Sequence, residues 1–114
     1  MEKRIILLIG YKGLIGNYLY NFFLKKKYVE LKLVDKKENL SLVDRSSLEK
    51  FLKKNKNIDY IINASGKNDH VVKFGDKKNY ENNEILQSYI TENVIGPKNL
   101  IELSSKICKN LKSI

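Results

Sequence analysis

The sequence predicts an α/β fold with a doubly wound parallel sheet, and three patterns carry this prediction. Short, β-branched apolar runs alternate with stretches of helical period. The first apolar run stops at a glycine and opens into a helical pattern through the Gly-x-x-Gly-x-x-Gly spacing of residues 10–16. Asp35 closes the second apolar run. We expect the 114 residues to form a single domain, 1–114, with a modest core.

The first half of the chain is expected to contain three strands and one helix. Residues 3–9 are short, β-branched and bounded by glycine, which predicts a buried strand. From residue 14 to about residue 27, apolar side chains recur at helical spacing on one face. A second strand is expected over 28–34. The link 36–39 is too short for a crossover helix, so a third strand is expected to follow directly, over 40–43.

The second half begins with a signal for the start of a helix. Ser46 and Glu49 have the spacing of a capping box, which predicts a helix from Ser46 to about Asn55. A strand is expected over 58–63, where small residues end it. Residues 67–80 are polar and show no period, which predicts a long loop.

A last helical pattern begins near Asn83 and continues toward the end of the chain. Gly96 and Pro97 interrupt it. Local rules predict a break or a kink there, because proline cannot donate the helix hydrogen bond.

Composition argues against several classes of protein. The net charge of +9 comes from short lysine runs at predicted helix ends and in loops, so a solvated surface is expected and not a nucleic-acid partner. No apolar run approaches the roughly 20 residues of a membrane span, so no membrane partner is expected. Cys108 is the only cysteine, which allows no intrachain disulfide and no zinc-binding spacing. We therefore expect no metal site and a reducing, cytoplasmic location.

The glycine pattern indicates a dinucleotide site. Gly10 allows a tight turn, Gly13 leaves room for a pyrophosphate against bare backbone, and Gly16 lets the helix pack closely on the strand. Asp35 is placed to accept a hydrogen bond from a ribose hydroxyl. The competing interpretation is a tight strand-to-helix turn without a ligand. The intervening loop residues expected to join the site are Tyr11, Lys12, Leu14 and Ile15.

Together these patterns resemble the N-terminal half of an extended short-chain dehydrogenase/reductase of the NAD-dependent epimerase/dehydratase superfamily. Within that group the chain is most similar to nucleotide-sugar reductases of the dTDP-4-dehydrorhamnose reductase type. The matching segments are 10–16, Asp35, 43–44, 59–64 and 93–100. The resemblance implies a Rossmann fold, a short link between the second and third strands, and a last helix that runs on through its Asn-x-x-Gly segment.

The resemblance also implies further cofactor-binding residues. Val43 and Asp44 would flank the adenine, and Asn93 would be a structural asparagine near the active site. Asn63, Ala64 and Ser65 would line the ribose on the nicotinamide side. Local roles remain open for three of them: Asp44 as a helix-start residue, Asn63 as a partner for strand-end backbone, and Asn93 as an exposed helix residue.

The acidic residue after the second strand bears on the choice of cofactor. Asp35 favours NAD, because a carboxylate accepts from a hydroxyl and repels a 2'-phosphate. Lys12, Lys36 and Lys37 lie close enough in sequence to offset that repulsion. We expect NAD, with NADP as the alternative.

The family's catalytic groups, a Ser or Thr after the fifth strand and a Tyr-x-x-x-Lys pair on the next helix, have no counterpart here. The spacing occurs once, at Tyr28 and Lys32, but on a predicted strand, where the two residues lie about 13 Å apart. His70, the only histidine, is expected to be a solvated loop residue. No catalytic residue is therefore assigned.

Three functions remain in competition. The first is the NAD(P)-binding domain of a nucleotide-sugar reductase or epimerase, inactive alone because the catalytic half is absent. The second is a stand-alone dinucleotide-sensing module without catalysis. Nucleic-acid binding ranks last. Without further strands, the sheet edge at 58–62 and the apolar helix faces would lack cover, which predicts marginal stability and either self-association or a chain that supplies the missing half.

Overall fold

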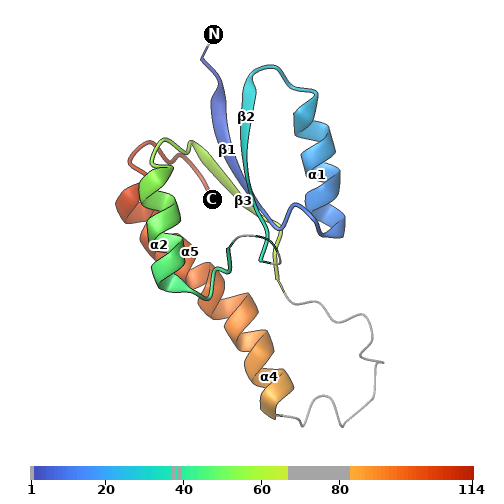
Figure 1. Cartoon of the computed structure of the whole chain (residues 1–114), viewed down its shortest axis with the longest axis vertical. Coiled ribbons are helices and arrows are strands. Elements are labelled where there is room, and N and C mark those ends of the chain that lie inside the picture. The colour runs from blue at the N-terminus through green and yellow to red at the C-terminus, as the bar shows by residue number, and fades with distance from the viewer. Residues whose placement is uncertain (1, 37, 39, 67–82) are drawn as a thin grey trace.

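The chain folds as a three-stranded parallel sheet flanked by helices (Figure 1). The computed structural model describes residues 2–36, 38, 40–66 and 83–114, so the predicted loop 67–80, His70 and Lys37 lie outside the described residues. In chain order the elements are β1 (Arg4–Ile9), α1 (Leu14–Leu24), β2 (Val29–Val34), α2 (Arg45–Lys54), β3 (Tyr60–Asn63), α4 (Asn83–Ile90), the π-helix η1 (Thr91–Ile95) and α5 (Gly96–Ile107).

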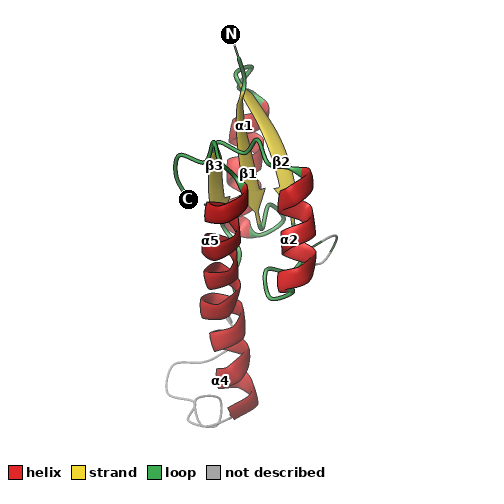
Figure 2. Ribbon diagram, turned by 90° about the vertical axis from the view of Figure 1, so that its left-hand side faces the viewer, coloured by secondary structure: helices red, strands yellow, loops and turns green. Residues whose placement is uncertain are grey.

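The strands lie in the order β2-β1-β3, and both neighbouring pairs are parallel. Figure 2 shows α1 on one face of the sheet and α2 with α5 on the other. Because β1 is central, its carboxyl end lies between those of β2 and β3. The predicted α/β fold with a doubly wound parallel sheet is confirmed.

The hydrophobic core lies between the sheet and the α2–α5 pair. Inward side chains of β1, β2 and β3 meet leucines of the two helices and of the link before α2, and burial of such apolar surface is the main stabilising term. These residues include Leu7, Ile9, Val34, Leu40, Leu42, Leu48, Leu52, Ile61, Leu100 and Leu103.

The other face of the sheet is only partly covered. Helix α1 contacts β1 and β2, and its residues Leu19 and Phe23 are half-buried. Its outer face is apolar but exposed: Leu14 is 90%, Ile15 67% and Tyr18 72% accessible. The helix also ends at Leu24, one turn before the predicted end at residue 27. The apolar residues at helical spacing therefore predicted the helix correctly, but several of these residues are exposed in the structure.

The predicted third strand over 40–43 is wrong, since this segment forms turns. The amide of Leu40 donates to Asp35 O (3.3 Å) and that of Asp44 donates to Ser41 O (3.2 Å), so local turns use the groups that a strand ladder would need. Leu40 and Leu42 are nevertheless buried in the core. Their alternation reflects that burial and not strand pairing.

The start of α2 also differs from prediction. The N-cap is Asp44, whose carboxylate accepts from Ser47 N at 3.2 Å, and Ser46 lies inside the helix. The Ser46–Glu49 capping box is therefore wrong, because an aspartate two residues earlier supplies the cap. Strand β3 begins at Tyr60, two residues later than expected, because the Asp59 carboxylate accepts from Ile5 N (2.9 Å) in place of a strand carbonyl.

The last helix does not break at Gly96 and Pro97. Helices α4, η1 and α5 follow one another without a gap; α5 packs beside the sheet, and α4 extends away from it (Figure 1). In the π-turn, Gly96 N donates to Thr91 O, five residues earlier. This wider turn precedes the proline that cannot donate. The break predicted from local rules is wrong, and the run-on helix that the resemblance implied is confirmed.

The end of the chain returns to the outer edge of β3. Lys112 N donates to Asp59 O (2.8 Å), Ile61 N donates to Ser113 O (3.0 Å), and Tyr60 and Ser113 form a parallel bridge. The last residues thus pair with this edge through one isolated parallel bridge. No helix in the described part of the chain is long and apolar enough to cross a membrane.

Candidate functional site

The glycine loop joins the end of β1 to α1 at the carboxyl edge of the sheet. Gly10 has a φ of +81°, and its amide donates to Val34 O at 2.7 Å, which ties the loop to the end of β2. A Cβ at this position would lie 2.8 Å from Ser65 N and 2.9 Å from Ala64 C. Both the conformation and the space therefore require glycine here.

Gly16 is required by packing within the loop. A Cβ there would lie 1.9 Å from Gly10 O and 2.7 Å from Gly10 C, closer than any real contact. The first turn of α1 thus rests directly on the backbone at the end of β1, which confirms the close strand–helix approach expected from the sequence.

Gly13 has no such internal reason to be glycine. Its φ of −75° suits any residue, and a Cβ would meet only Gly10 O, at an ordinary 3.5 Å. Gly13 is exposed at the N-cap of α1. Space is therefore left open above bare backbone at the position where a pyrophosphate was expected to approach.

The start of α1 is suited to an anion. The first intrahelical bond runs from Asn17 N to Gly13 O (2.8 Å), so the amides of residues 14–16 precede the first helical bond. No side chain caps this end and no acidic residue lies in the first turn. Neither a side-chain cap nor an acidic residue of the first turn therefore compensates the positive end of the helix dipole.

Asp35 lies beside this loop, directly after β2. It is 8% accessible, and its carbonyl oxygen accepts from Glu38 N (3.1 Å) and Leu40 N (3.3 Å). Because Gly10 bonds to the neighbouring Val34, the acidic residue and the glycine loop share one corner of the sheet edge. The expected arrangement of a glycine loop next to an acidic strand end is present.

A polar cluster that the sequence did not reveal connects the same two loops. Glu38 accepts a hydrogen bond from the Tyr11 hydroxyl and forms an ion pair with Lys12. Hydrogen bonds from Lys12 and then Tyr11 lower the pKa of Glu38, while the bond to Glu38 raises the pKa of Lys12 and of Tyr11. At neutral pH the pair is therefore ionised.

The segment after β3 lies against the glycine loop. The Asn63 side-chain oxygen accepts from Ser65 N at 3.0 Å and from Ser65 Oγ at 2.5 Å, and Ala64 N donates to Ile9 O at 2.9 Å. Asn63 thus satisfies strand-end backbone, the local role left open by the sequence. The expected contact of this segment with a ribose stays a prediction.

Asn93 comes to the same edge from the π-turn. A Cβ at Gly66, whose φ is +149°, would lie 3.0 Å from Asn93 Oδ1, so the exposed asparagine lies over the end of β3. Gly66 is the last residue of the segment 63–66, which the resemblance implied for the ribose on the nicotinamide side. The fold therefore brings together the glycine loop, Asp35, the segment after β3 and Asn93.

Val43 and Asp44 lie just before α2, and local hydrogen bonds hold both residues. The amide of half-buried Val43 donates to Ser41 Oγ at 3.3 Å. Hydrogen bonds from Ser47 lower the pKa of Asp44, whose carboxylate caps α2. Asp44 therefore fills the helix-start role that the sequence left open, and its place beside an adenine stays a prediction.

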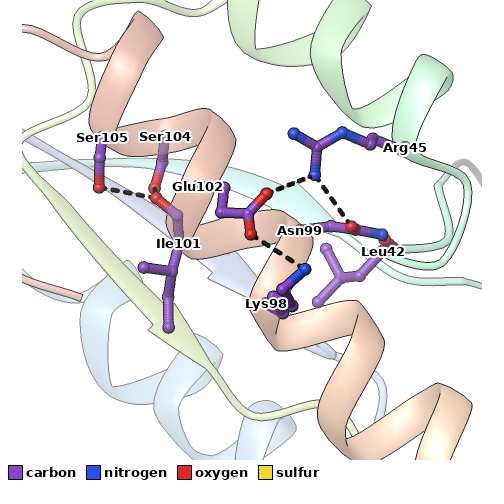
Figure 3. Close-up of polar contacts among 8 residues, drawn as sticks. All are labelled: Leu42, Arg45, Lys98, Asn99, Ile101, Glu102, Ser104 and Ser105. Atoms are coloured by element: carbon purple, nitrogen blue, oxygen red, sulfur yellow. Dashed lines mark hydrogen bonds and ion pairs between the residues drawn. The ribbon is translucent and has the colours of Figure 1, made fainter.

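A hydrogen-bond network connects residues 42–45, the segment that leads into α2, to α5 (Figure 3). Buried Asn99 donates to Leu42 O (3.0 Å) and accepts from Arg45 Nη1 (3.1 Å). Arg45 also pairs with Glu102 at 3.0 Å, and Lys98 pairs with the same carboxylate at 3.2 Å. The network connects segments far apart in sequence, and no local pattern indicated it.

The described residues at this edge offer groups that suit the binding of a nucleotide. Bare backbone amides suit a diphosphate, and a carboxylate at a strand end suits a ribose hydroxyl. Among residues 2–36, 38, 40–66 and 83–114, no group of three His, Cys, Asp or Glu side chains is placed to hold a metal ion. Cys108 is buried, and burial raises the pKa of its thiol, as expected for a structural cysteine.

The fold and this edge of the sheet define a dinucleotide-binding domain of the Rossmann type. The chain belongs to the NAD dependent epimerase/dehydratase family, whose model matches residues 6–112. A search of curated proteins gives no match.

Solved structures agree with this assignment at the level of the fold. The chain is similar to protein lin1944 from Listeria innocua, with 21% identity and a TM-score of 0.76, over 96% of this chain and 51% of that one. It is also similar to a small-chain dehydrogenase in complex with NADPH, with 14% identity and a TM-score of 0.73, over 98% of this chain and 50% of that one. The chain thus spans about half the length of these relatives.

Proposed function

We propose that this chain binds NAD(H) and forms the cofactor-binding part of an oxidoreductase or epimerase that acts on a nucleotide sugar. The observation that carries the proposal is Gly13. Packing explains the glycines at 10 and 16, whereas neither backbone conformation nor a contact with a described residue requires the one at 13, which keeps an open approach to helix amides that no side chain caps. A pyrophosphate is the group that makes use of such an approach.

The proposed binding mode assigns one role to each part of the edge. The backbone of residues 10–16 receives the pyrophosphate, and Asp35 accepts from the adenosine ribose. Val43 and Asp44 lie along the adenine, while residues 63–65 and Asn93 lie toward the nicotinamide. The cofactor supplies hydride transfer, and this chain's residues bind and orient it.

Turnover requires groups beyond those identified in this chain. The only Tyr-x-x-x-Lys spacing places Lys32 on β2 with Tyr28 just before it, where extended backbone keeps the two residues about 13 Å apart. We therefore expect binding without reduction by the 114 residues alone. The nucleotide-sugar substrate rests on the resemblance of the motifs to sugar-nucleotide reductases. A stand-alone sensing module is not favoured, since the family match is to epimerases and dehydratases.

We also propose that another stretch of polypeptide covers the exposed face of α1 and extends the sheet beyond Ser113. Support comes from the apolar side chains left accessible on α1 and from the isolated parallel bridge between Ser113 and Tyr60 at the edge of β3. The twofold greater length of the structural relatives points the same way. The lone buried thiol of Cys108 suits the reducing cytoplasm proposed for the protein.

Calorimetric titration with NADH tests the proposed binding. The unaltered chain should bind, and Gly13→Val should abolish binding while far-ultraviolet circular dichroism stays unchanged. Asn21→Val is the matched control, because it places the same side chain at an exposed position of the same helix. Equal binding by the Gly13 and Asn21 variants, or none by the unaltered chain, would contradict the proposal.

A further inference from the structure

The two described lysines nearest the acidic strand end are both held by carboxylates. Lys12, in the glycine loop, pairs with Glu38, and Lys36, directly after Asp35, pairs with Glu92 of the π-turn at 3.5 Å. These ammonium groups would otherwise be available to a phosphate on the adenosine ribose. Despite the net charge of +9, the described charged side chains at this corner include two lysines and three carboxylates, those of Asp35, Glu38 and Glu92.

Of the two glutamates that pair with these lysines, Glu38 contacts the glycine loop itself. It contacts both side chains that the glycine loop presents between its first two glycines, Tyr11 and Lys12. The hydrogen bond to Glu38 is the main cause that raises the pKa of Tyr11 and of Lys12, and the charge of Asp35 adds a smaller upward effect on both. Lys12 is 51% accessible and Glu38 36%, which leaves the pair open to an incoming nucleotide.

We propose that Glu38 is a specificity-determining residue that selects NAD(H) over NADP(H), by holding Lys12 away from the 2'-phosphate and by adding a like charge beside it. This inference rests on the proposed function, since it concerns the same dinucleotide. A 2'-phosphate carries close to two negative charges, so it meets Asp35 and Glu38 without a free lysine from the glycine loop. A 2'-hydroxyl meets no such repulsion.

The test compares NADH and NADPH affinities for the unaltered chain, Glu38→Gln and the double variant Lys12→Gln/Glu38→Gln. Glutamine keeps the size of Glu38 and removes its charge. The affinity for NADPH relative to NADH should rise about three- to tenfold in Glu38→Gln, the range between an exposed ion pair and a charged hydrogen bond. The double variant should keep only the part of this gain that comes from removing the Glu38 charge, because the released lysine is then absent.

Glu49→Gln is the matched control, since it removes one carboxylate, paired with Lys53, from the exposed face of α2. Its affinity ratio should stay within about twofold of the unaltered chain, as for independent sites. An unchanged ratio in Glu38→Gln, or an equal rise in Glu49→Gln, would overturn the inference while leaving dinucleotide binding intact. Absence of binding of both nucleotides to the unaltered chain would overturn the proposed function itself.

Discussion

Replacing Gly16 and Gly13 by alanine separates packing from ligand binding within one loop. In Gly16→Ala the new Cβ lies 1.9 Å from Gly10 O, and this neighbour is backbone and cannot swing aside. Overpacking of this kind costs about 1–3 kcal/mol, and alanine in a helix returns only about 0.5–1 kcal/mol, so the upper part of that range is expected, near 2 kcal/mol net. That loss corresponds to a Tm lower by about 10 °C for a domain of this size.

Gly13→Ala should behave in the opposite way. Its Cβ lies 3.5 Å from the nearest atom, and its φ is ordinary. The loss of a better N-cap, about 1 kcal/mol, is offset by the reduced entropy of the unfolded chain, about 0.4–1 kcal/mol. We therefore expect a stability close to that of the unaltered chain but NADH binding weaker by about tenfold or more, because the methyl group occupies the open approach.

Urea denaturation followed by circular dichroism measures the stabilities, and quenching or enhancement of NADH fluorescence measures binding. The reasoning is refuted if Gly16→Ala is as stable as the unaltered chain. Equal destabilisation by both variants would also refute it, since the structure gives only one of them a clash.

Three further predictions concern the surroundings of the site. Asn99→Ala should lower the free energy of unfolding by about 1–3 kcal/mol in urea, because buried Leu42 O loses its donor, whereas the exposed Ile101→Ala should change it by less than about 0.5 kcal/mol. Asp44→Ala should lower the Tm at neutral pH. The pKa of Asp44 is lowered in the folded state, so its contribution to stability is present above the pKa of the unfolded state and disappears as the pH falls below about 4. The plots of Tm against pH for the two proteins should therefore converge below that pH. Tyr18→Lys, on the exposed face of α1, should reduce concentration-dependent association in sedimentation velocity; an unaltered chain that remains a stable monomer at high concentration would count against the proposed cover for this face.

The sequence predicted those parts of the fold that depend on local signals. An apolar strand, a glycine pattern and a helical period lie next to one another in the first 24 residues, so β1, the loop and α1 follow from near neighbours. Asp35 was located by its position after an apolar run. The parallel order followed because helical stretches separate the strands and leave length for crossovers.

Predictions that depended on tertiary context were less secure. Residues 40–43 alternate like a strand, yet no strand of the described part of the chain pairs with them, and their leucines are buried by α2 and α5 instead. Asp44 and Ser46 are both good capping residues, and only the structure distinguishes them. The π-turn before Pro97 accommodates a residue that local rules treat as a break.

In the candidate site, too, the features set by local sequence were predicted and those set by tertiary contacts were not. Its backbone features are encoded locally by glycine, and they were predicted. The pairing of Lys12 with Glu38 and of Lys36 with Glu92 joins residues from separate loops and helices, so sequence spacing placed these lysines near the site but not in ion pairs. The network around Asn99 was missed for the same reason.

Titration of the ¹⁵N-labelled chain with NADH, followed by amide chemical shifts, tests the central claim most directly. The account predicts saturable shifts that are largest at the amides of residues 13–16, with further shifts at Asp35 and after β3. Shifts concentrated elsewhere, or a spectrum that NADH leaves unchanged, would contradict it.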